Sequence, residues 1–557
     1  MAAHELDAAT KAELATALRF LASDDAGLAV PLLEAAHERF EGKDPVLAAE
    51  IASHLSQAYV ATGRRTMALE LLGQAAEGVR SSGLEEIRSR ILMLAAPLHP
   101  SPDAGVKLAA EADRLASAWA DPRPRLYTMT TLFEQLQRAG HDEPLLPLAR
   151  FMSIQAKLCG DQAFATQAAV LEAELLQIQN DSGALVQARS AHAQTLLLGD
   201  PHWRARAAWT RGLAARQQGD FLEALECFDQ VSADRGHSDD ELRLERAMAC
   251  AQLGVEAEQT AKTLEAVSTC PDPALSRRAL LALANWTLDG GQLEAAEHWL
   301  GQLTATADQQ AVRARLHLAR GEGQKALQLL EVLESSAPTS PGLTLLHAEA
   351  LAAAGGLTQA LRLLDALVRS AQSQDRWLLL RALLQRAAVW TAQGATDQAR
   401  LDARQAADIA EEMHLPVHHA RARALVALAL ARQDLTEEAI SEIVAAADMA
   451  QRLGATGEST RLLLLQALVE PADRAAWQGA ALTATLEAAQ ALVDPRLLSV
   501  VLMALAAQAW DGEGDADAAN ALVSFASTLD GQIGNRLSNA IAALRARIAT
   551  ANQSEVH

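Results

Sequence analysis

A turn followed five residues later by a small residue recurs along most of the chain, and this spacing constrains the fold more than any other feature. In residues 205–231 the turn is Gly219-Asp220-Phe221, and Ala224 follows inside an apolar segment. Where two helices cross closely, a side chain that extends beyond Cβ pushes their axes apart. The pattern therefore predicts a series of helix pairs, each packed on the next.

Further copies of the pattern pair a turn residue with a small residue five positions later. They are Gly63 and Ala68, Gly291 and Ala296, Gly321 and Ala326, Gly355 and Ala360, Gly394 and Ala399, Gly514 and Ala519, and, more weakly, Asp24 and Ala29, and Asp434 and Ala439. A further small residue of the pattern stands at 260 or 261. Many of the intervals between successive small residues are close to 39 residues, and the distance from 68 to 224 corresponds to four such intervals. Between 261 and 360 the steps shorten to 30–35 residues.

The composition agrees with an all-helical chain. Half of the residues are hydrophobic but only 3% are aromatic, so alanine and leucine carry most of the apolar surface. These two residues lead the helix propensity scale. Alternating β-branched segments and Asn-Gly hairpins, which would predict strands, are missing from the sequence.

The repeated pattern resembles the tetratricopeptide repeat (TPR). That family ends its first helix before a Gly-Asp-Tyr-like turn, places an alanine at the helix crossing, and has a glycine where Gly212 stands here. The standard unit has 34 residues; the longer units here are similar to those in the sensor arms of MalT-like bacterial regulators. The aromatic residue near the end of the first helix is often replaced, as at Ala215, Thr287 and His317.

The resemblance implies a right-handed α-α superhelix of about fourteen helix pairs, whose work is to bind other proteins. We expect residues 1–557 to form one continuous solenoid. Its predicted parts are N-terminal repeats (1–200, less regular after 84), best-matching repeats (201–459), C-terminal repeats (460–548) and a frayed tail (549–557). Prolines are expected at the joints between units, because a proline begins a helix more readily than it continues one.

Charge and the absence of known motifs exclude several classes of protein. The formal net charge of −22 argues against a nucleic-acid binder. Without a leader-like N-terminus or a long apolar run, we expect a soluble protein of the bacterial cytoplasm. The four cysteines are scattered and are interpreted as free thiols. No phosphate-binding loop or nucleophile elbow is present, so neither an enzyme nor a cofactor is predicted.

Two segments have the composition of a metal site but the wrong spacing. Residues 511–522 offer alternating oxygen ligands like a calcium loop, but Ala516 and Leu522 replace the glycine and the closing glutamate. Pro416 separates His414 from His418 and His419, so a helical metal pair is not expected. We interpret the histidines as exposed in a loop, and no metal is predicted.

Arginine recurs at the position predicted to be second in each first helix. In the family the first helix lines the groove, and its inward face continues three, seven and ten residues later. The candidate partner-binding residues are therefore Arg206, Trp209, Leu213, Arg216, Arg243, Arg278, Asn285, Arg315, Arg381 and Arg421. A cation this close to a helix N-terminus opposes the helix dipole, so packing or a ligand should compensate.

Two interpretations of this arginine stripe stay open. Guanidinium groups and tryptophan rings suit an acidic or C-terminal segment of a partner protein. Alternatively, the arginine stems pack between repeats and pair with neighbouring carboxylates. A protein-binding scaffold or adaptor is the predicted function, with a sensor arm for a small ligand or peptide and a self-assembling scaffold as the alternatives.

Overall fold

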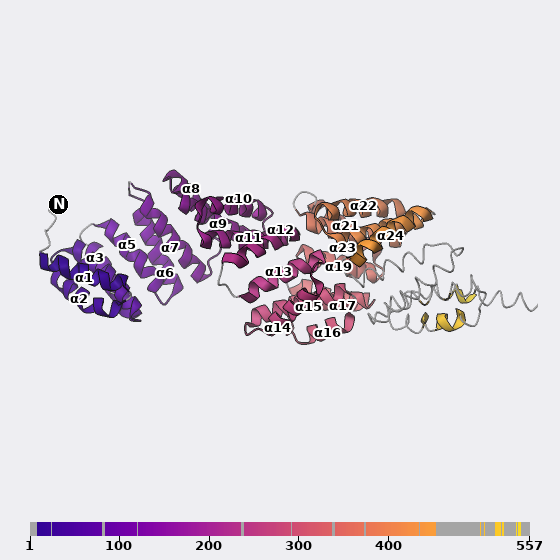
Figure 1. Ribbon diagram of the computed structural model, residues 1–557, viewed down its shortest axis with the longest axis horizontal. Coiled ribbons are helices and arrows are strands. Elements are labelled where there is room, and N and C mark those ends of the chain that lie inside the picture. Colours follow the sequence, from indigo (N-terminus) through magenta and orange to yellow (C-terminus); the bar gives the residue numbers. More distant parts are fainter. Residues whose placement is uncertain are drawn as a thin grey trace, which may run out of the picture. The chain divides into compact units, whose positions relative to one another are not determined.

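The computed structural model describes residues 8–452, apart from residues 24, 81–83, 120, 235–238, 291, 337–339, 372–374 and 434, together with scattered residues between 502 and 546. Within these residues the chain is an α-α superhelical repeat, built of helices without strands. Twenty-four α-helices and one short 3-10 helix, η1 (Ala96–Leu98), follow one another in antiparallel pairs (Figure 1).

The helices between residues 8 and 452 form twelve pairs. The first helices of the pairs are α1 (Ala8–Ala22), α3 (Pro45–Ala61), α5 (Glu85–Ala95), α7 (Arg123–Ala139), α9 (Gln162–Ile178), α11 (Pro201–Gln217), α13 (Asp239–Leu253), α15 (Pro273–Asp289), α17 (Ala307–Ala319), α19 (Pro341–Ala353), α21 (Arg376–Gln393) and α23 (Pro416–Ala431). The second helices are α2 (Ala26–Phe40), α4 (Arg65–Arg80), α6 (Pro102–Ala116), α8 (Leu145–Leu158), α10 (Ala184–Leu198), α12 (Phe221–Asp234), α14 (Ala257–Ser268), α16 (Leu293–Gly301), α18 (Gly323–Ser336), α20 (Leu357–Ala371), α22 (Thr396–Glu412) and α24 (Thr436–Arg452).

The small residues of the repeated pattern lie at the helix crossings, as the sequence predicts. Those with no exposed surface are Ala29, Ala68, Ala224, Ala296, Ala326, Ala360, Ala399, Ala439 and Ala519. Ala109, Ala149 and Ala188 divide the span from 68 to 224 into the four predicted intervals, and they are also buried, on α6, α8 and α10. In the pair α13–α14, the buried residue is Thr260 and not Ala261.

Gly212 also has the role that the sequence predicts for it. It lies on α11, and an added Cβ would come within 2.6 Å of the Phe228 ring on α12. Real Cβ contacts are not that short, so only glycine allows these two helices to approach as they do. The turn glycines at 63, 219, 321, 355 and 394 have φ values between 79° and 92°, a conformation that favours glycine.

Prolines begin several first helices, and this corrects one sequence expectation. Pro45 and Pro273 are first helical residues, preceded by the N-caps Asp44 and Asp272, whose side chains accept backbone N–H groups. The first helices therefore begin earlier than predicted. Arg206, Arg278, Arg381 and Arg421 each stand sixth and not second in their helices, beyond the first turn where the helix dipole acts most strongly.

Chain contacts divide the protein into two compact units, residues 1–210 and 211–557. In both units, first helices contact the first helices of adjacent pairs: α3 with α5 and α5 with α7 in unit 1, and each neighbouring pair from α13 to α23 in unit 2. No contact of similar extent joins second helices within the described residues. In each unit these first helices lie in a row, and the two stretches together are called here the first-helix row. Continuity of the solenoid across residue 210 stays a prediction.

Unit 2 contains an additional contact between helices far apart in the chain. Helix α13 touches α23. The ring of Trp377, at the start of α21, meets Phe221 of α12 edge-to-face at 5.3 Å and His418 of α23 at 4.9 Å. An added Cβ at Gly219 would lie 2.7 Å from the Trp377 Cβ. Thus one turn of the superhelix in unit 2 packs against another.

Candidate binding face on the first helices

All ten sequence-predicted binding residues lie on first helices. Arg206, Trp209, Leu213 and Arg216 belong to α11, Arg243 to α13, Arg278 and Asn285 to α15, Arg315 to α17, Arg381 to α21, and Arg421 to α23. The boundary between the units falls inside α11, after Thr210. Arg206 and Trp209 are therefore part of unit 1, and the other eight residues are part of unit 2. Trp209 and Leu213 are partly buried.

In unit 1, Arg206 is held by a carboxylate of the preceding first helix. Its Nε and Nη2 donate to the two carboxylate oxygens of Glu174 on α9, at 2.5 and 2.7 Å. Its guanidinium also lies 5.0 Å from the centre of the Trp203 ring. The hydrogen bond to Glu174 raises the pKa of Arg206. This arginine is therefore engaged within the chain by a two-pronged ion pair.

In unit 2, one buried carboxylate holds two arginines of the stripe. Glu245 on α13 is only 1% exposed, and its Oε2 lies 2.7 Å from Nε of Arg216 on α11. Its Oε1 accepts a hydrogen bond from Arg278 on α15, which also lies 3.5 Å from Glu241. Because water scarcely reaches Glu245, these two guanidinium groups replace water as the partners of its carboxylate. Three consecutive first helices are joined by this contact.

Arg315 on α17 is bound to residues of α15. It donates to Asn285 Oδ1, and its Nη2 lies 2.9 Å from Asp289 Oδ1. Burial raises the pKa of Asp289, but the charges of Arg315 and Arg421 outweigh it and lower that pKa below its ordinary value. Asp289 therefore stays ionised.

Arg381 on α21 has a different environment. Its guanidinium lies 5.7 Å from the centre of the Trp377 ring, one turn earlier on the same helix. Burial lowers the pKa of Arg381, and the nearby charge of Arg315 lowers it further, while Glu349, Asp289 and Asp375 act in the opposite direction. The residue keeps part of its surface open to solvent. Burial is thus the main effect that destabilises the positive charge of Arg381.

The interpretation of His418 as an exposed loop residue was wrong. Pro416 is the first residue of α23, so His418 is already helical and is 9% exposed against the Trp377 ring. Burial, with the charge of Arg421, lowers the pKa of His418 to about 3. Its Nδ1 has no hydrogen-bond partner within the described part of the chain. The imidazole is therefore neutral at physiological pH.

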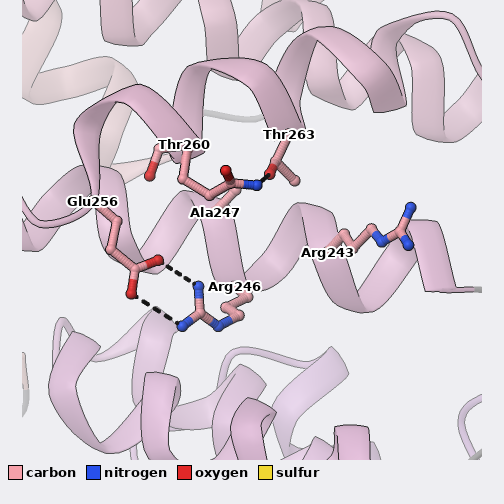
Figure 2. A pocket seen from close by; sticks show the side chains of 7 residues that line it. Arg243, Arg246, Ala247, Glu256, Thr260 and Thr263 are labelled. Carbon is pink, nitrogen blue, oxygen red and sulfur yellow. Dashed lines mark hydrogen bonds and ion pairs between the residues drawn. The ribbon is translucent and has the colours of Figure 1, made fainter.

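Arg243 differs from the rest of the stripe because it is exposed. It lies 3.8 Å from Asp240 and lines a cavity of about 190 Å³ between α13 and α14. Figure 2 shows it directed away from the Arg246–Glu256 ion pair, whose closest atoms are 2.8 Å apart. The cavity is also lined by Thr260, which replaces the alanine of other crossings. It is too small for a peptide and smaller than ordinary ligand pockets.

The carboxylate partners of the stripe were not singled out from the sequence. Glu174, Glu245 and Asp289 lie 32, 33 and 26 residues before the arginines that they contact. That spacing is about one repeat, so an acidic residue one unit earlier on a first helix was the available signal. The aromatic contact of Trp377 with Phe221 and His418 has no such signal, because it joins distant units.

Other sequence expectations concern metals, thiols and membranes. Within the described residues, no cluster of three metal-ligating side chains is found, and no helix is long and apolar enough to cross a bilayer. The four cysteines are free. Burial raises the pKa of Cys227 to about 11, which makes that thiol unreactive. Most of the calcium-like segment 511–522 lies outside the described residues.

Comparisons with known proteins support the fold. No protein-family model matches the chain, and no curated protein matches it. Among solved structures, it is similar to one titled "Crystal structure of APC/C hetero-tetramer Cut9-Hcn1", with a TM-score of 0.52 and 12% identity over 94% of this chain and 96% of that one. The match is to a TPR-repeat subunit, so the chain has a TPR-like α-α superhelical fold.

Proposed function

We propose that this protein is a scaffold or adaptor that holds a segment of a partner protein against the first-helix row. The observation that carries the proposal is the part of the row in unit 2, where the first helices from α13 to α23 contact one another in turn and carry arginine and tryptophan side chains. A preformed helical surface binds a segment without the cost of ordering itself. We further propose that it acts in the bacterial cytoplasm without catalytic activity or cofactor.

The ion pairs between arginines and carboxylates support different roles for different side chains of this row. Arg206, Arg216 and Arg278 stabilise contacts between successive first helices through Glu174 and Glu245. These pairs hold the spacing of the units, and with it the geometry of the face. Partner recognition then falls to the groups that such pairs leave accessible.

Affinity capture from the source cell, followed by mass spectrometry, tests this function. The full chain serves as bait, and a triple variant with Arg206, Arg278 and Arg381 replaced by glutamine is the comparison. Glutamine is preferred to glutamate, because glutamate would face Glu174 and Glu245 and disturb the fold. We expect a protein that is enriched with the wild type and lost with the variant, while circular dichroism is unchanged. Equal capture by both proteins would contradict the proposed face.

A second candidate function is a sensor arm whose pitch changes when a small ligand binds. The contact between α13 and α23 favours it, because two turns that touch can be separated or drawn together. Capture of a metabolite and no protein would select this candidate. Self-assembly is the remaining alternative, and light scattering of the purified chain tests it.

A further inference from the structure

Helices α8 and α10 of unit 1 expose a stripe of mainly apolar residues on the side opposite to their helix crossings. Successive residues turn by about 100° around a helix, so residues two before, two after, five after and nine after a crossing alanine lie opposite to it. The eight residues at these positions are all exposed, Leu158 by 74% and Leu197 by 91%. They are called here the second-helix patch, and they are Pro147, Phe151, Ile154 and Leu158 of α8 and Val186, Ser190, Ala193 and Leu197 of α10.

The corresponding positions are mostly charged on the second helices to either side. They include Lys107, Glu111 and Arg114 around α6, and Glu226 and Asp229 on α12. Of the twelve second helices between residues 8 and 452, only α8 and α10 contain no aspartate or glutamate. Exposed apolar side chains and missing carboxylates thus coincide on the same two helices. An exposed apolar patch of this kind marks an interaction surface.

Glu172 of α9 joins the two helices of the patch. Its Oε1 accepts a hydrogen bond from Arg150 Nε of α8 at 2.9 Å, and its Oε2 accepts one from Gln187 Nε2 of α10 at 3.0 Å. Because one carboxylate reaches both helices, α8 and α10 lie side by side, along one edge of unit 1 in Figure 1. Short turns at 159–161 and 179–183 connect them through α9, so they run in the same direction.

The charges near the patch are few, and several are engaged within the chain. Of the cations on the two helices, Arg150 is paired with Glu172, and Lys157 and Arg189 are exposed beside the stripes. The carboxylates at the ends of α8 and α10 belong to the turns, at Asp142, Glu143, Asp161, Asp181 and Asp200. Three of these, at 161, 181 and 200, accept backbone N–H groups. The patch therefore offers apolar contact more than ion pairing.

We propose that the second-helix patch is the interface of a two-fold symmetric dimer, in which α8 of one copy of this chain packs on α10 of the other. The middle of the α8 stripe is large, with Phe151 and Ile154, whereas the middle of the α10 stripe is small, with Ser190 and Ala193. A two-fold axis along the helices and midway between them opposes equivalent positions of α8 and α10. Large residues then meet small ones, as close packing requires. An axis across the helices would oppose α8 with α8, large with large.

This dimer goes beyond the proposed function and does not depend on it. The same patch serves both copies, so association stops at two, unlike an open-ended stacking of end repeats. The patch lies on second helices, so the first-helix row of each copy is left for a partner. Each stripe is only roughly 16 Å long, so we expect a weak dimer with a dissociation constant on the order of 10 µM.

Sedimentation velocity of the full chain at increasing protein concentration tests the dimer. Leu197→Glu is the disrupting variant. Leu401→Glu is the matched control, because Leu401 is 68% exposed at one of the corresponding positions of α22 and both variants add one negative charge. We expect dimerisation to weaken about tenfold or more in Leu197→Glu and less than about twofold in Leu401→Glu. Glutamate is a good helix former, so both variants should keep the circular dichroism of the wild type.

Three results of this experiment would overturn the proposal. They are a wild type that stays monomeric at about 100 µM, association that continues beyond two copies, and equal effects of the two variants. Capture of a partner by the first-helix row is measured with other variants, so the scaffold function stands or fails separately.

Salt dependence separates an apolar interface from one built on ion pairs. Two copies that each carry a net charge of −22 repel each other, and added salt screens this repulsion. We expect wild-type dimerisation to tighten between about 0.05 M and 0.5 M sodium chloride. Weakening over that range would assign the contact to ion pairs and overturn the apolar interface.

A charge pair across the interface tests which helices oppose each other. Leu158→Lys alone should weaken the dimer. The double variant Leu158→Lys, Leu197→Glu should dimerise about tenfold more tightly than Leu197→Glu at low salt, because each lysine then faces a glutamate of the other copy. A double variant as weak as Leu197→Glu would overturn the packing of α8 on α10.

Discussion

The two units are built from the same repeat but differ in how far their contacts reach along the chain. In the described residues of unit 1, the substantial contacts join helices that are neighbours or next-but-one neighbours. Unit 2 has these contacts and also the approach of α13 to α23, with Trp377 packed between Phe221 and His418. In a solenoid with only local contacts, the repeats fold and unfold one after another. A contact between turns instead couples the unfolding of repeats that are distant in the chain. We therefore expect unit 2 to respond to mutation more cooperatively than unit 1.

The largest expected effect comes from Gly219→Ala compared with Gly63→Ala. Both glycines have positive φ, 81° and 79°, so both variants carry similar backbone strain. Only at position 219 does an added Cβ meet a distant element, 2.7 Å from Trp377 Cβ, whereas nothing lies within 4 Å at position 63. We expect a loss of about 3 kcal/mol for Gly219→Ala and about 1 kcal/mol for Gly63→Ala.

Amide hydrogen exchange of the full chain measures this difference helix by helix. Gly219→Ala should reduce protection in α12, α21 and α23 together, while Gly63→Ala should affect only α3 and α4. If protection falls in α12 alone, the contact between turns does not couple the repeats of unit 2.

The next effect is a pH dependence specific to unit 2. The unfolded chain protonates His418 near pH 6.5, but the folded chain does so only near pH 3. The unfolded state therefore binds more protons between these values, and the free energy of unfolding falls as the pH is lowered through 6.5. From pH 7.5 to pH 5 we expect a loss of about 2 kcal/mol from this residue.

His418→Phe is the matched variant, because it keeps an aromatic ring against Trp377 and removes the titrating group. The difference in stability between wild type and variant, followed by urea denaturation at several pH values, should change by that amount and level off above pH 7. A difference that does not vary with pH would show that His418 is not buried in solution.

The smallest effect compares two carboxylates with the same role. Glu245 is 1% exposed and holds two arginines, whereas the side chain of Glu174 is 21% exposed and holds one. We expect Glu245→Gln to cost about 1–2 kcal/mol and Glu174→Gln less than about 1 kcal/mol, because solvent screens the more exposed pair. Thermal unfolding of both variants at low and high salt provides the measurement. Equal losses would mean that burial of the carboxylate does not set the strength of these pairs.

The sequence predicted the stripe of arginines but could not assign their roles. Arg206 and Arg278 look alike in the repeat pattern, and so does Arg381. Their difference depends on whether the carboxylate one unit earlier reaches the guanidinium group. Glu174 and Glu245 form ion pairs with Arg206 and Arg278, whereas Glu349, one unit before Arg381, acts on the charge of that arginine without a described ion pair. A sequence pattern that records one position in each repeat does not show which carboxylate contacts which arginine. His418 was misplaced for a related reason, because the helix that begins at Pro416 was read as a loop.

By itself, the sequence determined the helix pairs and their crossings, because small residues recur at a short, regular spacing and each crossing involves only neighbouring segments. Ala68 and Ala224 could be assigned in this way, and both are fully buried. Only the tertiary structure decided that Trp377 meets both Phe221 and His418, and that Arg381 lies beside this ring with no ion pair to a described carboxylate. Those outcomes depend on the accumulated rotation of many successive pairs, to which each pair contributes a small angle that its own residues do not reveal.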